Sequence, residues 1–141
     1  MLNQLTVFMQ NREGRLAQLC RALALADINM HSLYVADTED YGVARIFCDT
    51  PSAARKVLNS QGFRATLTPV VGIRVPNEKG GLANLLEFLD EHKVNIEYGY
   101  CFSVNQDYAI DVFRADEPGI ERELEQAGYV IVKKEEIYQR D

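Results

Sequence analysis

The segment Asn11-Arg12-Glu13-Gly14-Arg15-Leu16-Ala17 returns later in the chain as Asn77-Glu78-Lys79-Gly80-Gly81-Leu82-Ala83, at an offset of 77 − 11 = 66 residues. In both places an apolar, β-favouring run comes first, at residues 5–9 and 71–75, and a helical pattern follows directly. The shared element is therefore a strand, a glycine turn and a helix start. The first amide groups of a helix have no intrahelical partner, so such a turn can receive a small anion.

The repetition extends well beyond these two loops. At a constant offset of 66 the chain keeps identical residues through strands, helices and turns, as in the pairs Asn11/Asn77, Gly14/Gly80, Leu16/Leu82, Leu19/Leu85, Leu23/Leu89, Asn29/Asn95, Phe47/Phe113, Leu58/Leu124 and Gly62/Gly128. An ungapped offset predicts that the register is the same throughout the two copies. We interpret the pattern as an internal duplication, with a first repeat over residues 1–68 and a second over residues 69–141.

Each copy has the pattern β-α-β-β-α-β. In the first copy, strands are predicted at residues 5–9, 29–36, 41–48 and 63–67, with helices that begin after Gly14 and at Thr50-Pro51. In the second copy, strands are predicted at residues 71–75, 94–102, 108–113 and 129–132, with helices that begin after Gly80 and at Pro118. Pro69 is expected to separate the last strand of the first copy from the first strand of the second.

This order predicts an α+β fold made of two tandem ferredoxin-like units, each with an antiparallel sheet and its helices on one face. Gly62 and Gly128 are expected to be left-handed C-terminal caps of the second helix in each copy. In the charged tail from Lys133 to Asp141, only Ile137 and Tyr138 are expected to pack.

Composition limits the classes of function. The 141 residues are 47% hydrophobic and 26% charged, which is typical of a globular protein. The net charge of −6 disfavours binding to nucleic acid. No apolar run is long enough to span a membrane and no signal peptide is seen.

The three cysteines are widely spaced, which favours buried free thiols, and we expect a soluble cytoplasmic protein. His31 and His92 have no ligand-spaced partners, so no metal is expected.

The two copies resemble the ACT domain family, small regulatory modules that bind amino acids. The family pattern has an asparagine two or three residues before a Gly-Leu helix start, and the helix ends in Asn-Ile. Here the first copy closes with Asp27-Ile28-Asn29-Met30 and the second with Lys93-Val94-Asn95-Ile96. The resemblance covers nearly the whole chain, with no catalytic domain attached. Glu13 and Lys79 stand where family members often have a proline.

The chemistry of an amino acid suggests how the loops would bind one. The amides around Gly14-Arg15-Leu16 and Gly80-Gly81-Leu82 are candidates for the carboxylate. The side-chain carbonyls of four asparagines are candidates for the ammonium. The resemblance places the ligand between the first loop of one unit and the start of a second strand. The full candidate set is Asn11, Arg12, Gly14, Arg15, Leu16, Asn29, Asn77, Lys79, Gly80, Gly81, Leu82, Asn95 and Ile96.

Each candidate also has a structural explanation. The first-loop asparagines Asn11 and Asn77 are common turn and cap residues, and Asn29 and Asn95 could end a helix in a left-handed conformation. Glycine is needed in such a turn whether or not a ligand binds, and arginine and lysine are most often solvated. Because Gly81 lacks a side chain, the second copy is predicted to be the better binder.

The leading hypothesis is a non-catalytic amino-acid sensor or regulatory subunit without a cofactor. It would form a homodimer, act on a partner enzyme, and bind a free amino acid or related metabolite. Binding across two units would shift an assembly between states. Two alternatives stay open: a ligand-free dimerisation or partner-binding module, and a small hydrolase of acylphosphatase type that would use Asn11 and Arg12.

Overall fold

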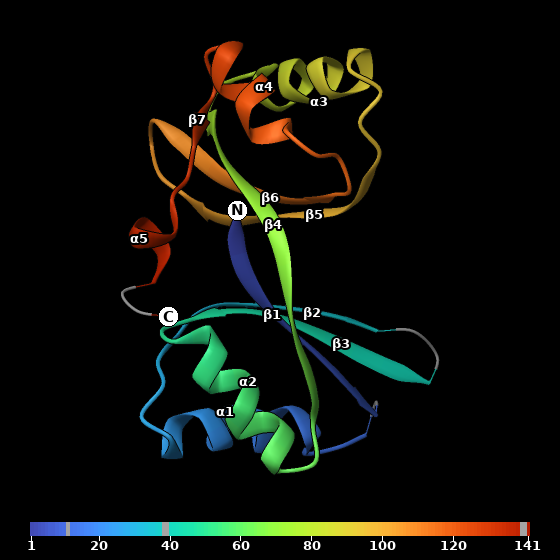
Figure 1. Ribbon diagram of the computed structural model, residues 1–141, viewed down its shortest axis with the longest axis vertical. Coiled ribbons are helices and arrows are strands. Elements are labelled where there is room, and N and C mark those ends of the chain that lie inside the picture. The colour runs from blue at the N-terminus through green and yellow to red at the C-terminus, as the bar shows by residue number, and fades with distance from the viewer. Residues whose placement is uncertain (11, 38–39, 139–140) are drawn as a thin grey trace. The chain divides into compact units, whose positions relative to one another are not determined.

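The computed structural model of the chain describes residues 1–10, 12–37, 40–138 and 141. The predicted element order is present, with one further short helix near the C-terminus (Figure 1). The elements are β1 (Leu2–Gln10), α1 (Arg15–Leu25), β2 (Met30–Asp37), β3 (Tyr41–Cys48), α2 (Pro51–Ser60), β4 (Arg64–Pro76), α3 (Gly81–Glu91), β5 (Ile96–Val104), β6 (Tyr108–Ala115), α4 (Ile120–Gln126), β7 (Val130–Ile131) and α5 (Lys134–Ile137).

One compact unit contains residues Asn3–Thr68 and Lys134–Asp141. Its strands are hydrogen-bonded in the order β4-β1-β3-β2, and β1 and β2 are both antiparallel to β3. Helices α1 and α2 lie together on one face of this sheet (Figure 1). Alternate residues of the strands meet the inner faces of the helices in a buried core that includes Leu5, Val7, Leu19, Leu23, Ala44, Ile46, Ala54 and Leu58.

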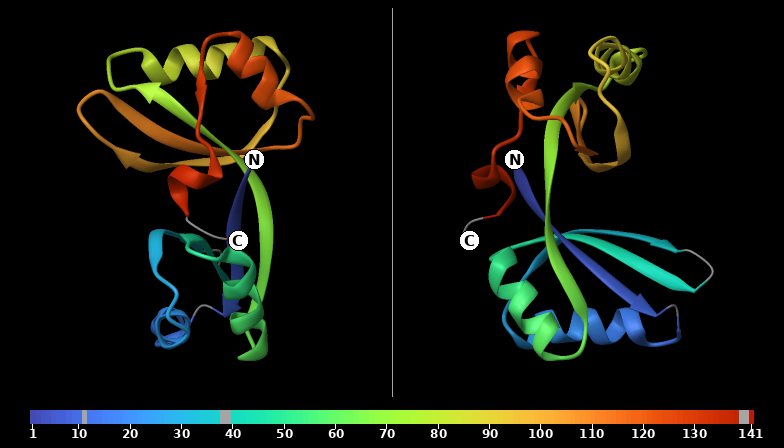
Figure 2. Two further views of the ribbon diagram at one scale, coloured as in Figure 1. Left: turned by 60° about the vertical axis from the view of Figure 1, so that its left-hand side comes forward. Right: turned by 45° about the vertical axis from the view of Figure 1, so that its right-hand side comes forward.

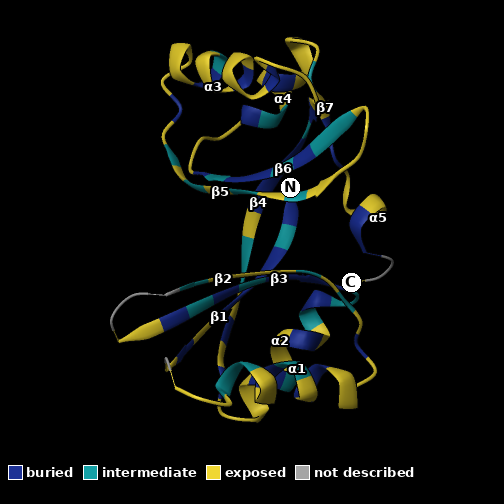
Figure 3. Ribbon diagram, turned by 180° about the vertical axis from the view of Figure 1, so that it is seen from behind, coloured by how far each residue is buried: buried dark blue, intermediate teal, exposed yellow. Residues whose placement is uncertain are grey.

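The other compact unit contains Met1–Leu2 and Pro69–Lys133. Its strand order is β7-β4-β6-β5, again antiparallel, with α3 and α4 on one face. The buried sides of these helices are turned toward the sheet (Figure 3). The core includes Val71, Ile73, Val75, Leu85, Leu89, Phe113, Ile120 and Leu124.

Counted within each repeat, the strand order is fourth, first, third, second in both units. The α+β prediction of two ferredoxin-like units with helices on one face is therefore confirmed. The division into domains at residues 1–68 and 69–141 stays a prediction, because each compact unit also includes residues from the far end of the chain.

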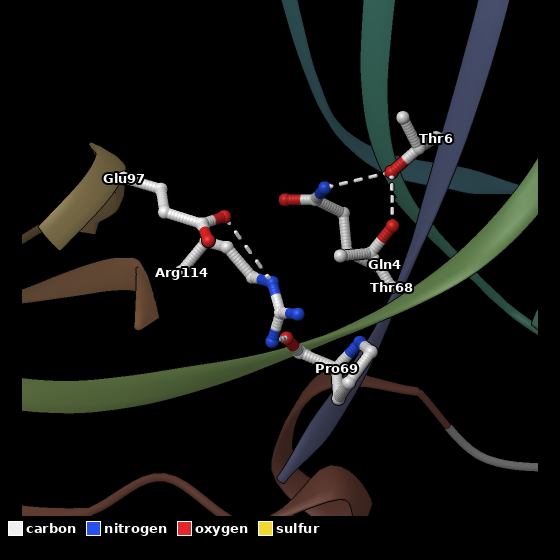
Figure 4. Close-up of polar contacts among 6 residues, drawn as sticks. All are labelled: Gln4, Thr6, Thr68, Pro69, Glu97 and Arg114. Carbon is white, nitrogen blue, oxygen red and sulfur yellow. Dashed lines mark hydrogen bonds and ion pairs between the residues drawn. The ribbon is translucent and has the colours of Figure 1, made fainter. Parts of the chain in front are cut away.

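The predicted break at Pro69 is wrong. Residues 64–76 form a single strand, β4, which Figure 2 shows as one continuous arrow. Pro69 is exposed within it, and proline is tolerated in a strand where its missing N–H leaves no ladder bond unmade. The Pro69 carbonyl accepts a hydrogen bond from Arg114 Nη1 at 3.2 Å, and Arg114 Nε lies 3.6 Å from Glu97 Oε2 (Figure 4).

Strand β1 carries two buried polar side chains on the face that does not point to its helices. Gln4 is 0% exposed and Thr6 is 3% exposed. Gln4 Nε2 donates to Thr6 Oγ1 at 3.0 Å, and the hydroxyl oxygens of Thr6 and Thr68 lie 2.7 Å apart (Figure 4). Burial of these groups is tolerated because each has a hydrogen-bond partner.

The ungapped alignment of the two repeats is wrong across the third strand. In the first repeat Leu5 pairs with Ile46, and in the second Val71 pairs with Phe113. The offset is 66 residues from Leu5 to Val71 but 67 from Ile46 to Phe113. The extra residue enters at a bulge in β5, where the pairing with β6 shifts between Cys101 and Ser103. Phe47 and Phe113 are therefore not structurally equivalent: Phe113 belongs to its unit's helix-facing core and Phe47 does not.

This shift places a carboxyl group on the helix-facing side of the second sheet. Asp111 pairs with Ile73, as Ala44 pairs with Val7 in the first repeat. Partial burial raises the pKa of Asp111 above its ordinary value of 3.8. The fold thus stabilises the neutral carboxylic acid relative to the carboxylate.

The C-terminal segment packs as predicted for Ile137 and Tyr138, which are 6% and 3% exposed. The Tyr138 hydroxyl accepts a hydrogen bond from the Asn3 amide at 3.1 Å.

Thr50 occupies the N-cap position of α2, but its side chain makes no capping bond. Instead the Asp141 carboxylate accepts a hydrogen bond from the Ser52 amide at 2.7 Å, so the tail helps to cap the helix.

All three cysteines are free, but only one is buried as expected. Burial raises the pKa of Cys48 to about 12, and Asp49 and Asp141 add to the effect. Cys101 lies exposed on β5, and Cys20 is half-buried.

We expect Asp111→Ala to raise the melting temperature at pH 7. In the parent, ionisation of the partly buried Asp111 carboxyl lowers the free energy of unfolding, and the variant has no such carboxyl. The gain should shrink as the pH falls through the raised pKa of the folded state, and should vanish below 3.8, where both folded and unfolded chains are protonated. Calorimetry at several pH values measures this. Asp116→Ala, at an exposed loop position, is the control. A lower melting temperature for Asp111→Ala at pH 7 would contradict the argument.

We expect Tyr138→Phe to reduce the free energy of unfolding by roughly 1 kcal/mol, because the Asn3 amide loses its acceptor in a partly buried place. Urea denaturation measures the loss, and hydrogen exchange should show weaker protection of the Asn3 amide. Unchanged protection of that amide would mean that the tail does not hold β1 in solution.

Candidate functional site

The two glycine loops have the same backbone geometry. In the first, the Arg12 amide donates to the Gln10 carbonyl at 2.9 Å and the Arg15 amide donates to the Arg12 carbonyl at 3.3 Å. In the second, the corresponding bonds run from Glu78 to Pro76 at 2.9 Å and from Gly81 to Glu78 at 3.1 Å. The shared turn directs each chain from a strand into a helix. Asn11 lies outside the described residues, so its predicted role is a proposal only.

Gly14 and Gly80 are the N-cap residues of α1 and α3. Their φ values of 80° and 82° lie in the left-handed region, which favours glycine. A Cβ placed on either glycine would meet no atom within 4 Å. Glycine has no side chain with which to cap the helix, so neither N-cap residue makes a side-chain bond to the amides that follow Arg15 and Gly81 in the first turn.

In the first repeat this turn borders an open cavity of about 310 Å³, called here the loop cavity. Its walls combine two arginines with apolar side chains and a glycine, and its lining residues are Met9, Gln10, Arg12, Arg15, Leu16, Val35 and Gly42. The structure thus brings three predicted residues, Arg12, Arg15 and Leu16, to one cavity. Its charge and volume suit a small anion with an apolar group.

Three contacts restrain the Arg15 side chain. Its guanidinium carbon lies 3.9 Å from the centre of the Phe63 ring, and Nη2 donates to the Gly62 carbonyl at 3.4 Å. Nη1 donates to Gln18 Oε1 at 3.1 Å. These contacts fix the guanidinium beside the first turn of α1. Because the side chain is already ordered, it loses less conformational entropy when a ligand binds.

The second loop differs at the position equivalent to Arg15. Gly81 is buried, and a Cβ on it would lie 2.3 Å from the Pro76 carbonyl oxygen. Its missing side chain makes room for the chain's own backbone. The expectation that Gly81 leaves this loop more open is therefore wrong. Lys79, Gly80 and Leu82 are exposed.

Asn77 secures the neighbouring hairpin. Its side-chain Nδ2 donates to the Asn105 carbonyl at 2.7 Å, and its backbone amide donates to the Asp107 carbonyl at 3.0 Å. Asn105 Oδ1 in turn accepts hydrogen bonds from the amides of Asp107 and Tyr108, both at 2.8 Å. The side chain of Asn77 thus joins the first loop of the second repeat to the turn between β5 and β6.

The remaining asparagines are not brought to the loop of their own repeat. Asn29 precedes Met30, which pairs with Cys48, whereas the loop follows Gln10, which pairs with Tyr41 at the other end of β3. The second repeat has the same arrangement, which leaves Asn95 and Ile96 at the far end of β6 from Pro76.

The alternative explanation of Asn29 and Asn95 as left-handed helix ends is wrong. The left-handed residue that ends the helix is Asp27 in the first repeat (φ 60°) and Lys93 in the second (φ 58°). In each case the following apolar residue donates back into the helix, Ile28 to Leu23 and Val94 to Leu89, both at 2.9 Å.

Sequence reasoning missed four lining residues of the loop cavity: Met9, Gln10, Val35 and Gly42. Met9 and Gly42 are ladder partners, and Val35 pairs with Ala44 on the helix-facing side of edge strand β2. Val35 is 44% exposed there, which is unusual for an apolar residue on that face. Alternation along the predicted strands could have indicated the face, but not the pairing.

Within the described ranges, no group of three or more His, Cys, Asp and Glu side chains is gathered as a metal ion would require. His31 Nε2 and Asp49 Oδ1 form a pair at 2.9 Å. No helix in the described part of the chain is both long enough and apolar enough to cross a membrane.

Several solved structures are similar to this chain. Protein BT0572 from Bacteroides thetaiotaomicron is 33% identical, with a TM-score of 0.90 over 98% of this chain and 96% of that one. The ligand-free regulatory subunit of aspartate kinase from Thermus thermophilus is 14% identical, with a TM-score of 0.66 over 89% of this chain and 90% of that one. The Thermus flavus subunit is 17% identical, with a TM-score of 0.62 over 91% and 94%. These two show a shared fold.

No protein with a curated description matches the chain. A family model described as an ACT domain pair matches residues 1–139. This match covers both repeats and agrees with the strand order and the paired glycine turns. The chain therefore belongs to the ACT domain pair family.

Proposed function

We propose that this chain is a non-catalytic regulatory or sensor protein, and that the loop cavity of its first repeat binds a free amino acid or a closely related metabolite. The observation that carries the proposal is the meeting of Arg12, Arg15 and the uncapped start of α1 at one cavity of about 310 Å³. A first loop closed by its own side chains would have favoured a ligand-free module.

Each part of an amino acid has a complement in the loop cavity. The amides that follow Arg15 in the first turn of α1 and the two guanidinium groups would bind the carboxylate by charge-assisted hydrogen bonds. The side-chain carbonyl of Gln10 is an acceptor for the ammonium. Met9, Leu16 and Val35 would contact the side chain, in the room left by Gly42.

Edge strand β2 offers a route from binding to regulation. It pairs only with β3 among the described strands, and Leu33, Tyr34 and Val35 on it are between 42% and 44% exposed. An exposed apolar edge strand favours pairing with a second copy. Since Val35 also lines the loop cavity, a ligand there would alter the same edge and so shift a dimer equilibrium.

The structural neighbours named regulatory subunits of aspartate kinase support a regulatory role and a partner enzyme for this chain. We propose a homodimer in the cytoplasm that changes the activity of such a partner when a ligand binds. This role needs neither a catalytic group nor a cofactor of its own.

Among the twenty amino acids, at least one should stabilise the protein against heat at roughly millimolar concentration or below. Arg12→Gln should weaken binding of that amino acid by about tenfold or more, because a charge-assisted hydrogen bond to the carboxylate is lost. Isothermal titration measures the affinity. Arg55→Gln, exposed on α2 of the same repeat, is the control and should bind like the parent. Twenty flat titrations of the parent would refute the proposal.

Gly14→Ala and Gly80→Ala form a matched pair that locates the site. Both glycines have nearly the same φ and no atom near a new Cβ, so both changes should cost about 1 kcal/mol of stability through backbone strain alone. We expect only Gly14→Ala to weaken ligand binding several-fold, as measured by titration of both variants. A larger loss in Gly80→Ala would move the site to the second repeat.

A further inference from the structure

A second cavity, called here the hairpin cavity, lies in the second repeat and takes no part in the proposed function. It measures about 400 Å³ and is formed where β4 ends, β6 begins and α4 turns into β7. Arg74 and Pro76 contribute from β4, Asp107 from the β5–β6 turn, Tyr108 from the start of β6, and Gly128 and Tyr129 from the turn after α4.

The first repeat has a cavity of about 350 Å³ in the equivalent place. Its lining includes Tyr41 and Gly62, which the corrected register and the helix cap equate with Tyr108 and Gly128. Gln10 pairs with Tyr41 just as Pro76 pairs with Tyr108. The ungapped alignment equates Tyr41 with Asp107 and therefore does not show this equivalence.

An arginine beside an aromatic ring is present in both cavities, although it comes from different positions. In the first repeat, the guanidinium of Arg64 lies 5.8 Å from the centre of the Phe8 ring. In the second, the guanidinium of Arg74, at the position equivalent to Phe8, lies 4.7 Å from the centre of the Tyr108 ring. Val130 stands where the first repeat has Arg64. Both cavities therefore hold a guanidinium next to an aromatic ring, although the arginine comes from a different strand position in each.

Several contacts hold the hairpin cavity in shape before any ligand arrives. The turn that carries Asp107 and Tyr108 is tied by Asn105 Oδ1 to both of their amides and by Asn77 to the preceding loop. On the opposite wall, Gly128 has a φ of 94° and donates to the Glu125 carbonyl at 3.0 Å. A rigid wall lowers the entropic cost of binding.

We propose that the hairpin cavity binds a small carboxylate attached to an aromatic or large apolar body. A guanidinium carries five N–H donors in one plane, so its face can stack on a tyrosine ring while donors in the plane bind a carboxylate. Tyr108, Tyr129 and Pro76 supply apolar walls, and the volume suits a ligand of this size. Asp107 would add a contact to any ammonium group that the ligand carries.

The test is an amide-resolved NMR titration of the full chain with three probes: 3-phenylpropionate, L-phenylalanine, and phenethylamine, which lacks a carboxylate. We expect both carboxylates, at concentrations up to about 10 mM, to shift the amides of Tyr108, Gly128 and Val130, and phenethylamine to leave them in place. Tighter binding of L-phenylalanine than of 3-phenylpropionate would support the contact to Asp107 as well. Equal binding would support the carboxylate site without that contact.

Arg74→Gln should weaken binding of both carboxylates by about tenfold or more, whereas Arg122→Gln, exposed on α4, should not. Should Arg74→Gln fail the urea denaturation check, Val130→Trp is the second variant. Val130 is 53% exposed at the cavity, and a larger side chain there should block binding without touching the arginine.

Three outcomes would overturn the proposal. They are no shift with either carboxylate, equal shifts with phenethylamine, and shifts confined to residues 12–16, which would assign the probes to the loop cavity. A failure of amino-acid binding at the loop cavity leaves the result at Tyr108, Gly128 and Val130 unaffected, so the two proposals can fail separately.

Discussion

The organisation of each repeat depends on one backbone constraint, the positive φ of Gly14 and Gly80. At these residues the chain passes from the end of a strand (β1 or β4) into a helix (α1 or α3) that packs on the same sheet. A left-handed residue makes this turn short, and glycine adopts it with little strain. The same turn removes the capping side chain from the helix start, so the feature that forms the fold also creates the polar end on which the candidate site is built.

The two repeats share this turn but use it differently. Arg15 follows Gly14 and lies over Phe63 beside an open cavity, whereas Gly81 follows Gly80 and is buried against the Pro76 carbonyl. One residue after the turn thus separates a loop suited to a carboxylate from one packed on its own backbone. The two loops therefore differ in the space beside the helix start, although their turns have the same geometry.

A single inserted residue also separates the repeats. The bulge between Cys101 and Ser103 moves β6 by one position, which brings Asp111 to the helix-facing side and aligns Tyr108 with Tyr41. Because side chains alternate along a strand, a shift of one residue changes the face of every residue that follows. The insertion therefore altered the core of one unit while it preserved the aromatic wall of the cavity at its edge.

The sequence by itself determined the duplication, the α+β class, the glycine turns and three residues of the loop cavity, because local periodicity and turn chemistry are written in consecutive residues. It did not determine that β4 runs through Pro69, that Met9 faces Gly42, or that the tail packs with the first repeat. Those features depend on which distant segments pair, and a bulge of one residue is invisible until the ladder is formed. Only the tertiary structure could decide which side chains meet at each cavity.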